Sequence, residues 1–315
     1  MEPLNCLVLG GTGFIGSHLC LDLLEKGHRV TVFAKSAFHP VLKEMNAYNG
    51  FAFIQGDLDN QDLMARTVQG QDLIFHLVSS TTPKVANDNP SHDVATNVVG
   101  TLHLLDLAKN SGVKKIVYAS SGGTVYGKPA VVPIPEEHPT WPTNSYAIHK
   151  LTNEKYLHMY HELYGLDYSV LRISNPFGER QRVGTGQGVI ANFLSKAYRN
   201  ETLEIWGDGK VIRDYVYIED VVAALVRVMD ETGSHKVFNI GSGEGKSLTD
   251  VVSAIEIVTG KLLEVRFLPG RNFDVPVNIL DIRKAKQELN WEPRVDFVEG
   301  LKRTAAFYQF EQIVK

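Results

Sequence analysis

Three glycines at the end of the first apolar segment constrain the fold of this chain more than any other feature of its sequence. Gly10, Gly13 and Gly16 lie in "LVLGGTGFIGSHL", where a β-branched segment gives way to a helical pattern. Gly10 permits a tight turn, Gly13 lets the backbone approach a ligand, and Gly16 lets the helix pack against the strand. The helix N-terminus then offers free N–H groups to an anion. The pattern predicts a strand–loop–helix unit that binds the pyrophosphate of a dinucleotide.

Short apolar segments alternate with helical patterns through the first half of the chain, which is typical of a parallel sheet covered by helices on both faces. The expected strands are residues 5–11, 28–34, 50–57, 72–78, 114–120 and 167–174, and the expected helices are residues 14–27, 60–70, 97–112 and 145–165. We expect an α/β fold, with a Rossmann-type doubly wound parallel sheet in residues 1–175. A smaller α/β substrate lobe should follow in residues 176–315, while a segment near 214–230 could return to the first lobe.

Composition narrows the classes of partner. The 315 residues carry a formal charge of -4 without a long run of one sign, so we expect no nucleic-acid partner. No apolar run reaches the roughly 18 residues that span a bilayer, and the N-terminus lacks a secretory pattern, so we expect a cytoplasmic protein without membrane contact. His158 and His161 could share a helix face, but no third ligand falls nearby at a metal spacing, and we expect no metal.

The end of the second strand departs from the usual dinucleotide pattern. An acidic residue about 20 positions after the glycines normally binds the adenosine ribose, but "VTVFAKS" places Ala34 there, followed by Lys35. A 2′-phosphate would meet no repulsion, and Lys35 could attract it, although Lys35 could equally be a solvated loop residue. The sequence predicts NAD and leaves NADP as an alternative. Asp57, which ends the third strand, could accept a hydrogen bond from the adenine amino group.

Tyr146 and Lys150 in "SYAIHK" lie one helical turn apart and share a helix face. A phenol with a pKa of about 10 is a poor base at neutral pH, whereas a nearby ammonium lowers that pKa. The pair can therefore remove a proton from a sugar hydroxyl while hydride leaves the same carbon. The same spacing also occurs where a packed tyrosine lies beside a surface lysine, so the pair does not decide the function alone.

Several motifs occur together in a fixed order: "GGTGFIG", "GDL", "FHLVSS", "NVVGT", "SSGGTVYG" and "YAIHK". In this order they resemble the extended short-chain dehydrogenase/reductase superfamily, and within it the NAD-dependent nucleotide-sugar epimerases of the UDP-galactose (UDP-glucose) 4-epimerase type. The resemblance continues through "LRISNPFGERQ", "WGDGKVIRDYVYIEDV" and "NIGSGEG", and it spans nearly the whole chain.

The resemblance implies roles for individual residues. The cofactor contacts that it implies, beside the three glycines, are Phe14, Ile15, Asp57, Leu58, Leu77, Val78, Ser79 and Asn97. Tyr146 is implied as the catalytic base, and Lys150 as its partner and as a contact to the nicotinamide ribose. The implied substrate contacts are Asn175, Arg213, Arg271 and Asp274, of which the two arginines would clamp the UDP diphosphate.

One catalytic position departs from the family pattern. Counting back from "TVYG", the usual catalytic serine or threonine falls on Gly122. Thr124 lies two residues further along an extended segment and would face the same side, so we expect Thr124 to supply the hydroxyl, with Ser121 as the second candidate. Alternatively, Gly122 makes room for a bulkier sugar and water mediates the contact.

The resemblance implies a 4-epimerase that acts on a UDP-hexose through a transient 4-keto sugar, with hydride passing to and from bound NAD. A 4,6-dehydratase is disfavoured because Gly123 and Thr124 replace the acidic pair that such enzymes use. An NAD(P)H-dependent nucleotide-sugar reductase or dehydrogenase stays open, as does a non-catalytic dinucleotide-binding sensor.

The identity of the sugar stays open among UDP-glucose, UDP-N-acetylglucosamine and UDP-glucuronic acid. Residues 79–88 and 180–188 are expected to border the sugar, and Lys84 is a cation expected to contact it. The helices at 97–112 and 145–165 carry wide apolar faces. The resemblance implies a homodimer through a four-helix interface, whereas the alternative is that these faces pack only against their own sheet.

Overall fold

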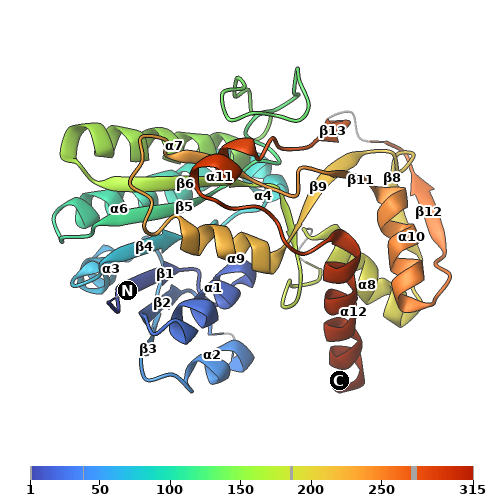
Figure 1. Cartoon of the computed structure of the whole chain (residues 1–315), viewed down its shortest axis with the longest axis horizontal. Helices are drawn as coiled ribbons and strands as arrows, with labels where there is room; N and C mark the ends of the chain where they lie inside the picture. Colours follow the sequence, from blue (N-terminus) through green and yellow to red (C-terminus); the bar gives the residue numbers. More distant parts are fainter. Residues whose placement is uncertain (1, 38, 185–186, 271–274, 315) are drawn as a thin grey trace.

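A seven-stranded parallel sheet forms the centre of the larger lobe in the computed structural model, which describes residues 2–37, 39–184, 187–270 and 275–314 (Figure 1). The strands follow the order β10-β6-β5-β4-β1-β2-β3. Their bounds are β1 Asn5–Leu9, β2 Arg29–Ala34, β3 Phe51–Gln55, β4 Leu73–His76, β5 Lys115–Ser121, β6 Asp167–Ile173 and β10 Val237–Ile240. The chain leaves β1 toward β3 and then returns to place β4 on the other side of β1. This reversal is the topological switch point at which open α/β sheets bind ligands.

Helices cover both faces of this sheet, which explains why its strands are apolar along their whole length. One face carries α1 (Phe14–Glu25), α2 (His39–Met45) and α9 (Ile218–Arg227). The other face carries α3 (Gln61–Val68), α6 (Gly100–Lys109) and α7 (Ser145–Tyr164). The fold class predicted from the alternating pattern is confirmed.

Two short helices and a π-helical turn precede α6, where the sequence predicted only the helix at 97–112. They are α4 (Pro83–Asp88), α5 (Pro90–Asp93) and η1 (Val94–Val99). Helices α4 and α5 each begin with a proline that follows a capping residue. Thr82 caps α4 by accepting from the Val85 N–H, and Asn89 caps α5 by accepting from the His92 N–H. Turns of π-helix inside α-helices are frequent at functional sites.

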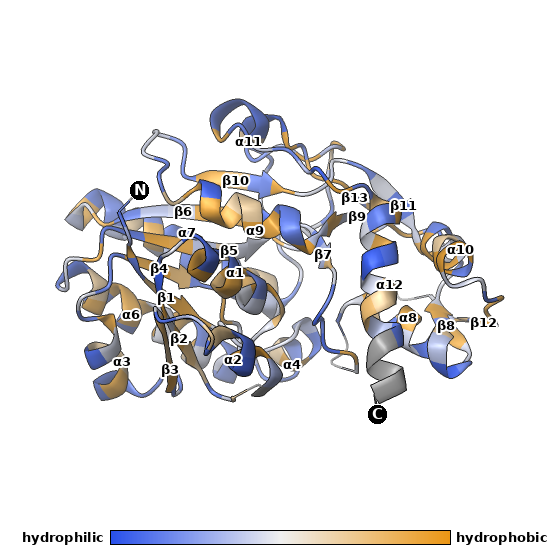
Figure 2. Ribbon diagram, turned by 60° about the horizontal axis from the view of Figure 1, so that its bottom comes forward, coloured by the Kyte–Doolittle hydropathy of each residue, from blue (hydrophilic) through white to orange (hydrophobic). Residues whose placement is uncertain are grey.

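The smaller lobe is built around β9 (Ile212–Tyr217). Three strands pair with β9, namely β11 (Gly245–Ser247), β13 (Val277–Asn278) and β7 (Asn175–Phe177). A separate parallel pair joins β8 (Leu203–Trp206) to β12 (Val265–Leu268). The helices of this lobe are α8 (Val189–Arg199), α10 (Leu248–Thr259) and α12 (Phe297–Val314). Figure 1 shows these elements beside the main sheet. Figure 2 shows α11 (Arg283–Glu288) above β10, which it contacts.

The chain crosses between the lobes more than once. β9 pairs within the smaller lobe, but α9, which follows directly, packs against α1, and β10 then adds the seventh strand to the main sheet. Figure 2 shows the apolar residues that run along β10 and α9. The division into two domains at residue 175 therefore stays a prediction. Residues 218–227 (α9) and 237–240 (β10), which follow that boundary, pack in the larger lobe. Within the described residues, no helix is both long and apolar enough to cross a membrane.

Candidate active site

A cavity of about 680 Å³ lies beyond the carboxyl ends of β1, β4 and β5 and is lined by residues of both lobes. It brings together most of the predicted site residues. Those that line it are Gly10, Gly13, Phe14, Ile15, Gly16, Leu77, Ser79, Ser121, Thr124, Tyr146, Lys150, Asn175 and Arg213. The predicted residues that do not line it are Lys35, Asp57, Leu58, Val78, Lys84 and Asn97.

The glycine loop has the geometry of an anion site. Gly10 adopts a φ of +86°, and its carbonyl accepts a hydrogen bond from the Gly13 N–H at 2.9 Å. A Cβ on Gly16 would lie 2.3 Å from the Gly10 carbonyl oxygen, so only glycine allows this approach. No side chain of the described residues caps the start of α1. The first N–H groups of α1 are thus suited to bind the pyrophosphate of NAD.

On the adenosine side of the site, two of the predicted cofactor contacts pair with each other. Lys35 and Asp57, both predicted to contact cofactor, form an ion pair with each other at 2.5 Å between Nζ and Oδ2. An opposite charge in contact makes Lys35 a weaker partner for a 2′-phosphate. Leu58 is buried, 3.3 Å from where a Cβ on Gly100 would lie, and Val78 packs against Gly10.

Helix α7 presents the two predicted catalytic residues from its first turns. Asn144 caps this helix by accepting from the Ala147 N–H at 2.9 Å. The Lys150 Nζ donates to the carbonyl oxygen of Ala119 at 2.8 Å and lies 5.8 Å from the centre of the Tyr146 ring. Both side chains face the same cavity, as the one-turn spacing predicted.

The pKa of Tyr146 does not follow the simple expectation. Burial raises the pKa of Tyr146 to about 12, while a hydrogen bond with Ser121 acts in the opposite direction. Burial also lowers the pKa of Lys150 to about 8. The Lys150 ammonium alone therefore does not make the Tyr146 phenol a base. Burial of the phenol raises its pKa by more than the Lys150 charge lowers it.

Of the two candidates for the missing hydroxyl, Ser121 is the one that interacts with Tyr146. Gly122 does not line the cavity, and a Cβ there would lie 2.4 Å from the Leu280 Cδ1. Ser121, the last residue of β5, interacts with the Tyr146 phenol. Thr124 donates to the Ser121 Oγ at 2.9 Å. These contacts favour Ser121 over Thr124 as the hydroxyl beside Tyr146, with Thr124 as its support, and the choice between them stays a prediction.

The substrate side of the cavity is supplied by β7 and β9. Asn175 donates to the Asp214 carbonyl at 3.0 Å, and the Arg213 Nη1 donates to the carbonyls of Ile212 and Val275 at 2.8 and 2.7 Å. These bonds fix Asn175 and Arg213 at the cavity wall. The predicted contacts Arg271 and Asp274 lie outside the described residues.

Lys84, which was predicted to contact the sugar, does not line the cavity in this structure. It lies in α4, and its side chain is 86% exposed in an ion pair with Asp88 one turn further on. Of the second predicted border segment, Gln181, Gln187 and Gly188 line the cavity, whereas Arg180 pairs with Glu44 at 2.5 Å.

Some lining residues escaped the sequence analysis, among them Thr143 and Tyr215. Tyr215 lies two residues after Arg213 on β9, so strand alternation places both on one face. That signal was present in the sequence. Gln181 belongs to the predicted border segment 180–188, and its side chain donates to the Pro176 carbonyl across a turn. Among the described residues, no group of three or more histidine, cysteine or acidic side chains could hold a metal ion.

Comparison with known proteins decides the family. A family model for the NAD dependent epimerase/dehydratase family matches residues 6–241. The chain belongs to this family. It is 37% identical over 309 residues to a UDP-glucose 4-epimerase of Mycolicibacterium smegmatis, which covers 97% of this chain and 99% of the relative.

Solved structures of the family superpose closely on the chain. A Thermotoga maritima UDP-glucose 4-epimerase with UDP-glucose matches with a TM-score of 0.92 and 36% identity, over 99% of this chain and 100% of the other. A Thermus thermophilus UDP-glucose 4-epimerase in complex with NAD matches with a TM-score of 0.89 and 32% identity, over 97% and 99%. The predictions of this family, of NAD as cofactor and of a nucleotide-sugar 4-epimerase are confirmed.

Proposed function

We propose that the protein interconverts the C4 epimers of a UDP-hexose, with Tyr146 as the base and UDP-glucose as the first candidate substrate. The observation that carries this proposal is the convergence of Tyr146, Ser121 and Arg213 on one cavity beside the glycine loop. The reaction needs a base at C4, a cation for the diphosphate and a bound hydride acceptor, and the cavity wall offers residues suited to each.

Each residue at the cavity wall has a separate role in the proposed reaction. Arg213, oriented by its two carbonyl partners, supplies a fixed cation for the diphosphate. Ser121 shares its hydroxyl with the phenol of Tyr146 and with the sugar oxygen. Tyr146 takes the proton of the 4-hydroxyl, and Lys150 lies one turn along the same helix, against the Ala119 carbonyl.

The glycine loop and Lys150 would hold NAD, which would supply the hydride acceptor for C4 and a positive ring that favours the ionised phenol. The chain's own part is to hold the diphosphate while the 4-keto sugar turns, so that either face meets the cofactor. Water must stay out during this turn, and the buried Lys150 and the half-buried Tyr146 limit its access.

Proton NMR of the protein incubated with UDP-glucose, UDP-N-acetylglucosamine and UDP-glucuronic acid tests this proposal. We expect a new anomeric signal from one C4 epimer with NAD present in catalytic amount, and no net reduced cofactor. Conversion that consumes NADH or NADPH in proportion would instead make the protein a reductase. Cofactor binding without conversion of any nucleotide sugar would favour the sensor function.

We also propose a homodimer through α6, α7 and the preceding η1. Five apolar side chains on η1 and α7 are between 38% and 63% exposed: Val94, Val99, Ile148, Met159 and Leu163. The two helices lie side by side, so their outer faces form one surface. Light scattering coupled to size exclusion should give twice the chain mass. Ile148→Glu together with Leu163→Glu should give the monomer, and an unchanged mass would contradict this interface.

A further inference from the structure

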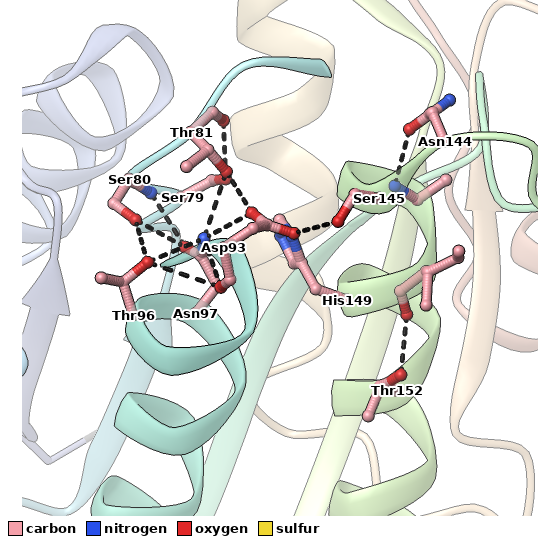
Figure 3. Close-up of polar contacts among 12 residues, drawn as sticks. Ser79, Ser80, Thr81, Asp93, Thr96, Asn97, Asn144, Ser145, His149 and Thr152 are labelled. Atoms are coloured by element: carbon pink, nitrogen blue, oxygen red, sulfur yellow. Dashed lines mark hydrogen bonds and ion pairs between the residues drawn. The ribbon is translucent and has the colours of Figure 1, made fainter. Parts of the chain in front are cut away.

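One buried carboxylate joins three segments next to the cavity. Asp93, the last residue of α5, is 0% exposed and accepts hydrogen bonds from four side chains (Figure 3). The donors are Thr81, Asn97 at 2.9 Å, Ser145 at 2.9 Å and the Nδ1 of His149 at 2.9 Å. A buried charge is costly unless it is fully paired, and these donors pair it.

Each donor comes from a segment that shapes the site. Thr81 lies in the loop after β4 and lines the cavity. Asn97 lies in η1 and accepts from the Ser80 N–H at 2.9 Å, which holds that same loop. Ser145 is the first residue of α7 and directly precedes Tyr146. Asp93 therefore fixes the start of the catalytic helix against the loop that borders the cofactor side.

His149 extends this contact along α7. It lies between Tyr146 and Lys150 in sequence, is 2% exposed, and its ring meets the Tyr146 ring edge to face at 5.1 Å between centres. Burial, with the nearby Lys150 charge, lowers the pKa of His149 to about 4, so the ring is neutral near pH 7. Hydrogen bonds lower the pKa of Asp93, which is ionised. The neutral Nδ1–H must then be the donor to the carboxylate.

We propose that Asp93 and His149 are positioning residues that fix the first turn of α7, and through it the orientation of the Tyr146 phenol toward the sugar. This inference rests on the proposed role of Tyr146 as base. It assigns a function to a pair that touches the ring of Tyr146 without reaching the reacting atoms.

The charge of Asp93 also affects the pKa of Tyr146. A change in that pKa would distinguish an effect on Tyr146 from a general loss of stability. The groups that face Tyr146 are Asp93 from α5, His149 and Lys150 from α7, and Ser121 and Tyr118 from β5. The negative charge of Asp93 raises the pKa of Tyr146. Loss of that charge should lower the pKa, so the ionised base should persist to lower pH.

The test compares Asp93→Asn with Asp62→Asn, the same change at an exposed position of α3. Asp93→Asn should lower kcat about 10- to 100-fold, because a small displacement of a catalytic group costs that much. KM should change little, and the acid limb of the pH profile of kcat should move to lower pH. Asp62→Asn should match the wild type. The inference would be overturned if both variants had the same kcat and the same pH profile. It would also be overturned if Asp93→Asn lost kcat only in proportion to its loss of thermal stability, while the acid limb of its pH profile stayed in place.

A second pair of variants keeps the test valid if Asp93→Asn does not fold. His149→Asn places an amide donor where the Nδ1–H lies, whereas His149→Leu removes the donor at similar volume. We expect His149→Asn to keep most of kcat and His149→Leu to lose it with KM unchanged. Equal activity of the two variants would overturn the role of the hydrogen bond.

A substrate-free readout distinguishes failure of this inference from failure of the proposed function. The tyrosinate absorbance after a rapid jump to alkaline pH, minus that of the matching Tyr146→Phe protein, reports Tyr146 ionisation. A lower midpoint in Asp93→Asn than in the wild type supports the inference even if no UDP-sugar is converted. Identical midpoints overturn it whatever the reaction proves to be.

Discussion

The two sides of the cavity are built in different ways. The cofactor side consists of backbone and glycine from one short stretch, with Gly10 and Gly16 in close contact over a single turn. The sugar side consists of side chains from β5, β7, β9 and the loop after β7, which are brought together by the fold. Arg213 and Ser121, for example, are 92 positions apart in the numbering and share one wall.

This difference explains what the two sides tolerate. A backbone site depends on a few conformations that any sequence with the right glycines can adopt, so it recurs in many proteins. A side-chain site depends on the placement of individual groups, and each can change while the fold stays the same. The cofactor side should therefore respond to added volume, and the sugar side to lost functional groups.

The largest effect is expected at the point where the two sides meet. Tyr146→Phe removes the base and should lower kcat about 10²- to 10⁴-fold, as loss of a general base does. NAD binding should persist, because the glycine loop is unchanged. Tyr156→Phe on the same helix is the matched control and should stay near wild type in the NMR epimerisation assay. Near-normal turnover of Tyr146→Phe would require another base.

On the sugar side, Ser121→Ala should have the next largest effect. Loss of a hydrogen bond to a charged group costs about 1.5–3 kcal/mol, which corresponds to about a tenfold to hundredfold drop in kcat. Thr124→Ala removes only the support of Ser121 and should cost less. Steady-state kinetics of the two variants checks this order, and a larger loss in Thr124→Ala would restore threonine as the direct partner of the phenol.

On the cofactor side, Gly16→Ala tests the response to volume. The new methyl would lie 2.3 Å from the Gly10 carbonyl oxygen and 2.7 Å from the Gly11 Cα, both backbone atoms. Overpacking of this kind costs about 1–3 kcal/mol, so NAD affinity and thermal stability should both fall. Gly270→Ala, where the nearest atom is at 3.6 Å, is the control. Calorimetric NAD titration that shows equal affinity in both variants would contradict the close approach.

Gly122→Ser tests whether a hydroxyl can be restored at the position that the family pattern marks. The structure predicts a loss, since the side chain would enter the core beside Leu280 at a cost of about 1–3 kcal/mol. Thermal unfolding should show lower stability, and kcat should not rise. A gain in kcat at unchanged stability would show that this side chain reaches the cavity.

The smallest effect is expected for Lys35→Ala. Lys35 is bound to Asp57 on the surface, and exposed ion pairs contribute about 0–1 kcal/mol. NAD affinity should therefore change less than about fivefold, as should the preference for NAD over NADP. A selective loss of NADP binding would show that Lys35 leaves Asp57 to contact a 2′-phosphate.

The sequence was informative wherever local physics decides the structure. The glycine spacing, the buried strands and the one-turn separation of Tyr146 and Lys150 all depend on residues close in the chain, and each was placed correctly. Side-chain direction was not predictable where a turn intervenes, so Thr124 was expected ahead of Ser121, whereas Ser121 is the residue that interacts with the Tyr146 phenol. The helix at residues 83–88 was not predicted, and its cap at Thr82 and its first proline leave Lys84 exposed.

Long-range assembly explains the remaining omissions. Asp93 and His149 are 56 positions apart, and neither carries a local signal of its partner. The pKa of Tyr146 likewise depends on burial that only the folded chain creates. β10 was missed as a strand of the main sheet because the chain passes through the smaller lobe before it returns.

The central claim is that Tyr146 promotes the removal of hydride from C4 and that the same hydride returns to C4. The most direct test incubates the protein and NAD with UDP-glucose that carries deuterium at C4, and follows both epimers by NMR and mass. The account predicts that deuterium stays at C4 in the substrate and in the new epimer, with none in the solvent. Epimerisation accompanied by exchange of the C4 deuterium with water would contradict it, because a proton and not a hydride would then be leaving the carbon.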